Sequence, residues 1–163
     1  MVGSIQMKPE VYFLKYSFPC AFIAQQKGEI NEGDIEELEY AARNNISLPR
    51  EKLEKIFFRA FKRMEPIIKE LGKDRWDLEV FKEYFLRKHN GMVEKGFEFS
   101  KEIPRTLKEL CKVHRAEITN KNGDVLTVRY GDRTRTVLNI LVPNAKIGDV
   151  VTIHYGYACE VIS

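Results

Sequence analysis

The chain has 163 residues, and its 27 Lys and Arg against 24 Asp and Glu leave a formal net charge of +3. With 44% hydrophobic and 31% charged residues, the composition is typical of a globular protein and excludes a disordered or fibrous chain. The longest uncharged stretch, residues 16–26, is shorter than the roughly 20 residues of a membrane span, and residues 1–10 lack the features of a signal peptide. We therefore expect a cytoplasmic protein with no membrane partner.

The opening segment, residues 11–22, has helical spacing that Pro19 interrupts. This pattern predicts either a kink or two short helices that meet at Ser17. A second helix is predicted after Gly33, with Asp34 as its N-cap and an end at residues 44–45.

The longest predicted helix covers residues 53–71, where apolar residues recur at steps of three and four over about six turns. Gly72 is expected at its C-terminus, and Pro66 is expected to bend it. A further helix is predicted from Asp77 to a stop at residues 90–91. Together these segments predict a small helical domain.

From His114 onward the apolar period changes to two, which predicts four or five short antiparallel strands. Turn dipeptides separate them at residues 122–123, 131–132 and 148–149. So few strands must curl to bury one apolar face, which favours a small closed or half-closed barrel.

The two parts of the chain differ in amino-acid composition. All 10 Phe and the single Trp precede residue 100, whereas the remainder is rich in Val, Ile and Thr. We therefore predict an α+β protein with a helical domain over residues 1–107 and a β-barrel over residues 108–163. A barrel this small is marginally stable alone, so docking on helices would stabilise it.

Three cysteines, Cys20, Cys111 and Cys159, are an odd number at wide spacing. Such a set argues against a disulfide scaffold and indicates thiols that are kept reduced inside a cell. Cys20 follows Pro19 near a predicted helix start, where it is either a reactive thiol or, among apolar neighbours, a buried and inert one.

The closing run Ile147–Ala158 contains Gly-Asp, a few apolar residues, and then His154, Gly156 and Ala158 at alternate positions. Cys111 stands seven residues before Ile118, which we expect in the first strand. In these features the last third of the chain resembles the HypC/HupF hydrogenase-maturation chaperones.

The resemblance implies a small antiparallel OB-like barrel that binds a scaffold protein and escorts an iron carrying cyanide and carbonyl ligands. The client would be the precursor of a nickel–iron hydrogenase large subunit. The family's functional thiol maps onto Cys111 and its closing-strand histidine onto His154, and Gly156 would let the two proteins approach closely. No tightly bound cofactor is expected, only a transient iron.

The chain departs from the family after the cysteine. Family members carry this cysteine as their second residue, followed by an apolar stretch that ends in Pro-Gly. Here Cys111 is internal and is followed by Lys112, His114, Arg115 and Ala116. The alternative interpretation is therefore a protein-interaction module that kept the barrel and lost the iron chemistry.

Two pairs of soft ligands flank the predicted barrel: Cys111 with His114, and His154 with Cys159. Thiolate and imidazole suit iron or zinc, and four such groups would complete a tetrahedral site in a zinc-stabilised domain. The alternative is structural, with Cys159 in the core, both histidines half-exposed on strands, and Cys111 packed at the domain junction.

Arg129, Arg133 and Arg135 flank a predicted turn and, with Tyr130, would suit an oligonucleotide-binding barrel. The alternative is a solvated strand face balanced by nearby aspartates. Since the chain carries little net charge, nucleic acid is not the expected partner. Catalytic triad orders and phosphate-binding glycine loops are absent from the sequence, so we expect a metallocentre-assembly chaperone or accessory protein rather than an enzyme.

Overall fold

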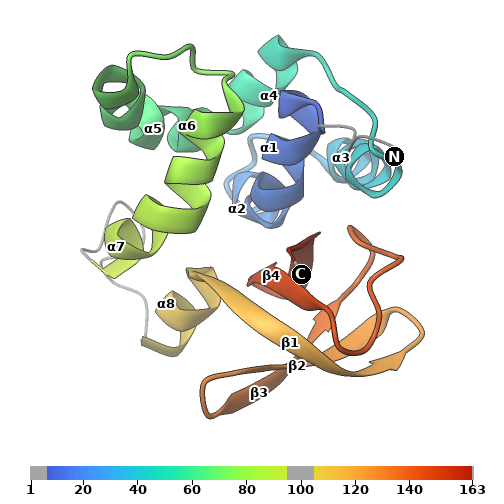
Figure 1. Ribbon diagram of the computed structural model, residues 1–163. Coiled ribbons are helices and arrows are strands. Elements are labelled where there is room, and N and C mark those ends of the chain that lie inside the picture. The colour runs from blue at the N-terminus through green and yellow to red at the C-terminus, as the bar shows by residue number, and fades with distance from the viewer. Residues whose placement is uncertain (1–6, 95–104, 163) are drawn as a thin grey trace, which may run out of the picture. The chain divides into compact units, whose positions relative to one another are not determined.

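In the computed structural model the chain divides into two compact units, Met1–Phe81 and Lys82–Ser163. The structure describes residues 7–94 and 105–162 (Figure 1). The first unit is helical, and the strands of the second unit close into a barrel, so the predicted α+β class is confirmed. Within the described residues, no helix combines the length and apolar character needed to cross a membrane.

The opening segment forms two short helices, as predicted. Helix α1 (Pro9–Ser17) and helix α2 (Ala21–Gln26) are joined by a 3-10 turn, Phe18–Cys20. Pro19 lies in that turn and has no N–H to donate, so an uninterrupted α-helical ladder is not available here.

Helix α3 (Glu32–Asn44) begins with a capping box. The Asn31 side chain accepts a hydrogen bond from the Asp34 amide, and the Asp34 carboxylate accepts one from the Asn31 amide, each at 2.9 Å. The prediction of Asp34 as the N-cap was therefore wrong, because both residues carry a suitable acceptor and the helix starts at the earlier one. Its end is confirmed by Asn45, which is left-handed at φ 57°.

The long helix predicted over residues 53–71 is two helices, α4 (Arg50–Ile56) and α5 (Phe58–Leu71). The break lies at Phe57, with φ −104° and ψ 35°, whereas Pro66 remains inside α5. Phe57 is 4% exposed, and its ring packs edge-on against Phe13 with centroids 5.5 Å apart. The break thus accompanies a tertiary contact that periodicity does not reveal.

Phe13 lies at the centre of the first unit's core. Its ring centroid is 4.8–5.6 Å from four other aromatic rings, those of Phe57, Phe61, Trp76 and Phe81. Three of these pairs are tilted or edge-on and the pair with Phe61 is stacked. Aromatic pairs stabilise a core by roughly 0.5–1.5 kcal/mol each beyond the area they bury. This cluster accounts for much of the aromatic bias of the first half of the sequence.

The next helix does not stop at residues 90–91 as predicted. Helix α6 (Leu78–Lys82) continues through a π-helical segment, Glu83–Lys88, into α7 (His89–Glu94). Helix α8 (Arg105–Cys111) then leads directly into the first strand.

Over the described residues the second unit contains five strands: β1 (Val113–Asn122), β2 (Val125–Tyr130), β3 (Arg133–Leu138), β4 (Val150–His154) and β5 (Tyr157–Val161). They close into a barrel in the order β1-β2-β3-β5-β4. The pairing is mixed and not purely antiparallel as predicted, because β3 and β5 run parallel where they meet. Both predicted hairpin turns are present, with Gly123 and Gly131 left-handed at φ 63° and 59°.

The barrel core follows the predicted alternation. Its buried members are small or branched apolar side chains: Ala116, Ile118, Leu126, Val128, Val137, Ala145, Val151, Ile153 and Ala158. Residues 82–94 and α8 belong to the same compact unit as this barrel. The domain boundary inferred from composition, between residues 107 and 108, stays a prediction.

The capping box makes a prediction about the first unit. Replacing Asn31 by Ala removes the acceptor for the Asp34 amide and should lower the free energy of unfolding by about 1 kcal/mol, measured by urea denaturation. Glu36→Ala, at an exposed position inside the same helix, should change it by less than about 0.5 kcal/mol. Equal effects of the two substitutions would contradict the importance of the cap.

Candidate functional site

The fold brings Cys111 and His154 to the same end of the barrel. Cys111 is the last residue of α8, and only Lys112 separates it from β1. His154 is the last residue of β4, and its register partner in β1 is Val113. Since β1 and β4 are antiparallel neighbours, the start of one lies beside the end of the other.

The Cys111 thiol is buried, with only 5% of the residue exposed. Its Sγ donates a hydrogen bond to the Tyr155 hydroxyl at 2.8 Å. The Tyr155 amide in turn donates to the Leu110 carbonyl at 2.8 Å. The residue after His154 therefore joins the end of β4 to the end of α8 through its backbone and its side chain.

His154 is 1% exposed and packs among aromatic rings. Its imidazole meets the His89 ring edge-on, with centroids 5.1 Å apart, and lies 4.7 Å from the Tyr155 ring. His89 is itself 6% exposed and lies edge-on to Tyr84 at 5.6 Å. Two histidines from a helix and a strand thus form a buried pair, which sequence spacing did not indicate.

The candidate four-ligand metal site is not assembled. His114 stacks on Tyr130, with centroids 4.6 Å apart, and its Nε2 lies 3.3 Å from the Glu109 carbonyl oxygen. Cys159 is buried in β5, where its Sγ lies 3.8 Å from the Tyr157 carbonyl.

Within residues 7–94 and 105–162, no three His, Cys, Asp or Glu side chains are grouped to hold a metal. The structure therefore does not gather Cys111, His114, His154 and Cys159 into one centre. Neighbouring strand residues face opposite sides of the sheet, so His114 is directed away from the side of its neighbour Val113.

Gly156 lies in the two-residue connection between β4 and β5. Tyr155 adopts the left-handed conformation there, at φ 54°, whereas Gly156 is outside the positive-φ region. Gly156 is exposed, and a Cβ atom added to it would meet no other atom within 4 Å. The chain itself therefore has no steric need for glycine at this position.

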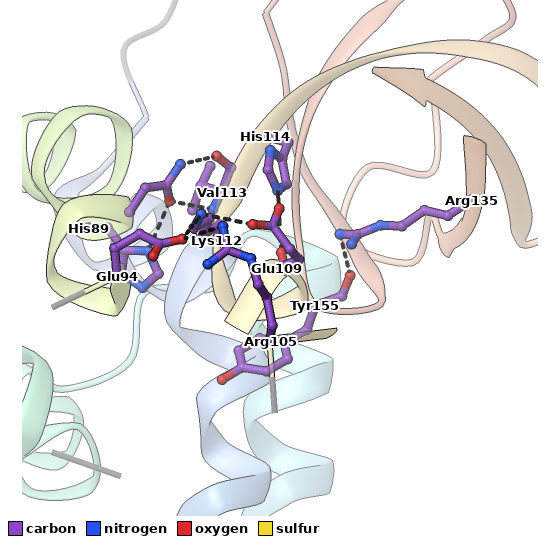
Figure 2. A network of polar contacts seen from close by, with 10 residues as sticks. His89, Glu94, Arg105, Glu109, Lys112, Val113, His114, Arg135 and Tyr155 are labelled. Atoms are coloured by element: carbon purple, nitrogen blue, oxygen red, sulfur yellow. Dashed lines mark hydrogen bonds and ion pairs between the residues drawn. The ribbon is translucent and has the colours of Figure 1, made fainter. Parts of the chain in front are cut away.

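A network of charges joins α7, α8 and β1 at this end of the barrel (Figure 2). The Lys112 ammonium group lies between two carboxylates, binding Glu109 at 2.8 Å and also Glu94. Glu109 Oε2 lies 3.7 Å from Nε2 of His114. The hydrogen bond from Lys112 lowers the pKa of Glu109, so the network favours the ionised form of this carboxylate.

Asn90 in α7 hydrogen-bonds to the backbone of Val113, the first residue of β1. Its Nδ2 donates to the Val113 carbonyl at 2.8 Å, and its Oδ1 accepts from the Val113 amide at 2.7 Å. The side chain thus satisfies both backbone groups of Val113, as a neighbouring strand would. Asn90 was predicted to stop a helix, and no local signal in the sequence distinguishes that role from this one.

The predicted basic edge is partly engaged within the chain. Arg129 binds Glu117 at 3.0 Å. The Arg135 guanidinium donates to the Tyr155 carbonyl at 3.0 Å and lies over the Tyr130 ring at 5.5 Å. Arg133 is exposed. Two of the three arginines are therefore engaged within the chain, and the expectation that nucleic acid is not the partner stays a prediction.

Comparisons with models of known protein families and with curated proteins find no match to this sequence. What the site can do is therefore argued from its geometry. That geometry is a buried thiol and a buried imidazole at one barrel end, close in sequence to an exposed glycine and to a charged network.

Burial predicts the order of thiol labelling. Cys111 and Cys159 are buried, whereas Cys20 is half-buried. A maleimide reagent should label Cys20 first in the native chain, because the other two react only when the structure opens locally. Peptide mass spectrometry at increasing times measures this order, and labelling in urea should abolish it. Labelling of native Cys111 as fast as Cys20 would contradict the buried geometry.

His114 predicts a loss of stability in acid. Its burial lowers its pKa, so the unfolded chain takes up this proton before the folded chain does. The stabilisation is thus complete above the ordinary pKa of about 6.5 and falls as the pH drops through that value. Urea unfolding at about pH 7.5 and about pH 5.5 should show a larger loss for the wild type than for His114→Phe, which keeps a ring against Tyr130. Equal losses in the two proteins would contradict this assignment.

Proposed function

We propose that the chain is a metallocentre-assembly chaperone of the HypC/HupF kind, with an OB-like barrel that binds a maturation scaffold or the precursor of a nickel–iron hydrogenase large subunit. The observation that carries the proposal is the juxtaposition of α8 and β4. Cys111 and His154, which the resemblance singles out, lie at one barrel end although they are far apart in sequence. A closed five-stranded barrel supports the OB-like assignment.

In the proposed mechanism the Cys111 thiolate contacts the partner or the iron fragment that is the cargo. Iron binding releases the thiol proton, because the thiolate is the ligand form. Until a partner displaces it, Tyr155 is able to hydrogen-bond the sulfur both as thiol and as thiolate. Its hydroxyl oxygen accepts from the thiol in the structure, and its O–H is able to donate to a thiolate. His154 would bind beside the sulfur, as a hydrogen-bonding or ligating group.

A partner would have to expose the Cys111 thiol before contacting it. The thiol is buried. Next to it in sequence, Lys112 forms ion pairs with Glu94 of α7 and Glu109 of α8, which hold the end of α8 in place. Gly156 follows Tyr155 in the chain and is exposed. A Cβ atom added to it would meet open space. We propose that the partner approaches over Gly156 and displaces Tyr155, while the helical unit provides a second partner surface.

The second candidate is an interaction module without iron chemistry. Two observations favour it: the thiol is buried, and the His114 ring is engaged by Tyr130 and by the Glu109 carbonyl. In this case partner binding would not need the sulfur. The two candidates therefore differ in what happens when Cys111 is replaced.

The test is an anaerobic affinity capture from cells that contain the native partners, with bound proteins identified by mass spectrometry. The wild type should capture a maturation scaffold or a hydrogenase precursor. Cys111→Ala should reduce capture at least about tenfold, the equivalent of one strong contact. Cys159→Ala is the matched control, because it removes a buried barrel thiol that the proposal does not use.

Circular dichroism should show that both variants keep the fold. Equal capture by the wild type and Cys111→Ala would favour the interaction module. Capture of neither class of protein by the wild type would contradict the chaperone proposal. Gly156→Ala adds an independent check, since the chain has room for the methyl group but a close partner would not.

A further inference from the structure

Strand β3 has an edge that the barrel leaves largely uncovered. On one side β3 pairs with β2 along its whole length, from Arg133 to Leu138. On the other side it meets β5 at a single register pair, Leu138 with Tyr157. The barrel is thus closed at this seam by one bridge, and the rest of the β3 edge continues without a neighbouring strand among the described residues.

The orientation of the backbone groups on that edge follows from one hydrogen bond. The Leu138 amide donates to the Gly156 carbonyl at 2.8 Å, so it points away from β2. In an antiparallel pair the direction alternates with each residue, so the amide and carbonyl groups of Thr136 and Thr134 also point away from β2.

Both threonines are exposed. Over the part of the chain that the structure describes, no backbone hydrogen bond outside the β2–β3 ladder reaches the amide or carbonyl of either one. These four groups form a short row of unpaired donors and acceptors, which is the template that an added strand requires.

The side chains along the edge change from basic to apolar. Arg133 at the start of β3 is exposed, and Leu138 at its end is 37% exposed. Leu138 lies opposite Val125 of β2, which is 41% exposed. A segment lying along β3 would therefore meet a positive charge at one end and an apolar pair at the other, on opposite faces of the strand.

We propose that this β3 edge binds an extended segment of a partner protein as an additional strand, with an acidic residue near Arg133 and an apolar residue near Leu138. The unpaired backbone groups favour a peptide over a nucleic acid, because Arg129 and Arg135 are already bound to Glu117 and Tyr155. The inference goes beyond the proposed function and does not depend on Cys111 or on iron.

The premise is tested on the full chain alone by amide hydrogen exchange with NMR detection. Thr134 and Thr136 amides should exchange rapidly. Arg135 and Val137 amides, which point towards β2, should exchange far more slowly, since opening the hairpin is needed first. Slow exchange of both threonine amides would overturn the proposal, because it would mean that the edge is already covered.

Binding is tested with synthetic peptides of about eight residues, a typical strand length or slightly more. Glu-Thr repeats fill one half of the peptide and Thr-Val repeats the other, so that the Glu and Val side chains lie on opposite faces as Arg133 and Leu138 do. Both orders are made because either strand direction is allowed. Added peptide should shift and protect the Thr134 and Thr136 amides. N-methylation of the alternate peptide residues that face β3 should abolish binding, whereas N-methylation shifted by one residue should leave it intact.

A pair of variants tests the same edge from the protein side. Thr136→Pro removes an outward amide that the barrel does not use and should weaken peptide binding at least about tenfold. Thr136→Val keeps the amide and should bind like the wild type. If Thr136→Pro fails to fold, the N-methylated peptides on the wild-type chain still decide the question.

Three results would overturn the proposal. The first is a Kd weaker than about 1 mM for both peptide orders. The second is equal binding of the two N-methylated series. The third is protection of the threonine amides by an oligothymidylate or by a second copy of the chain, with none by the peptides.

Discussion

The antiparallel pairing of β1 with β4 is the constraint on which the rest of the second unit depends. Five register pairs, from Val113 with His154 to Glu117 with Val150, join the first strand of the barrel to the fourth. This pairing closes the sheet and places the end of α8 beside the end of β4. The candidate site is therefore a consequence of barrel closure, and the hydrogen bonds of Tyr155 to α8 reinforce it.

Helical residues complete the barrel unit. A barrel of about 54 residues buries only roughly 60% of the surface of its unfolded chain, so additional contacts matter to its stability. The side chain of Asn90 satisfies the backbone of Val113, and Lys112 joins Glu94 of α7 to Glu109 of α8. Composition changes where strands begin, whereas the compact unit begins earlier, because packing depends on which surfaces meet and not on which residue types dominate.

Two contacts between strands of the barrel, β1 with β4 and β3 with β5, differ in how many residues they pair. The contact of β1 with β4 is a ladder, while the contact of β3 with β5 is a single bridge reinforced by the Arg135 side chain on Tyr155. Short strands in a twisted barrel diverge beyond such a bridge, which leaves backbone groups at the seam available. The same chain thus buries its thiol and imidazole at one place and presents an open strand edge at another.

Local chemistry in the sequence determined the interruption at Pro19, the end of α5 at Gly72, and the strands and turns of the barrel. These features depend on residues within one or two turns of each other, so a linear pattern contains them. Cys111 and His154 were chosen from the sequence through a motif and not through geometry, and their role stays a prediction.

Only the tertiary structure decided the helix break at Phe57, the parallel seam of β3 and β5, and the contact of His89 with His154. It also stacked His114 on Tyr130 and, among the described residues, grouped no three candidate ligands to hold a metal. Each of these outcomes depends on a contact between residues far apart in the chain. The energy of such contacts overrides local preference, and spacing alone does not specify which distant partner a side chain will meet.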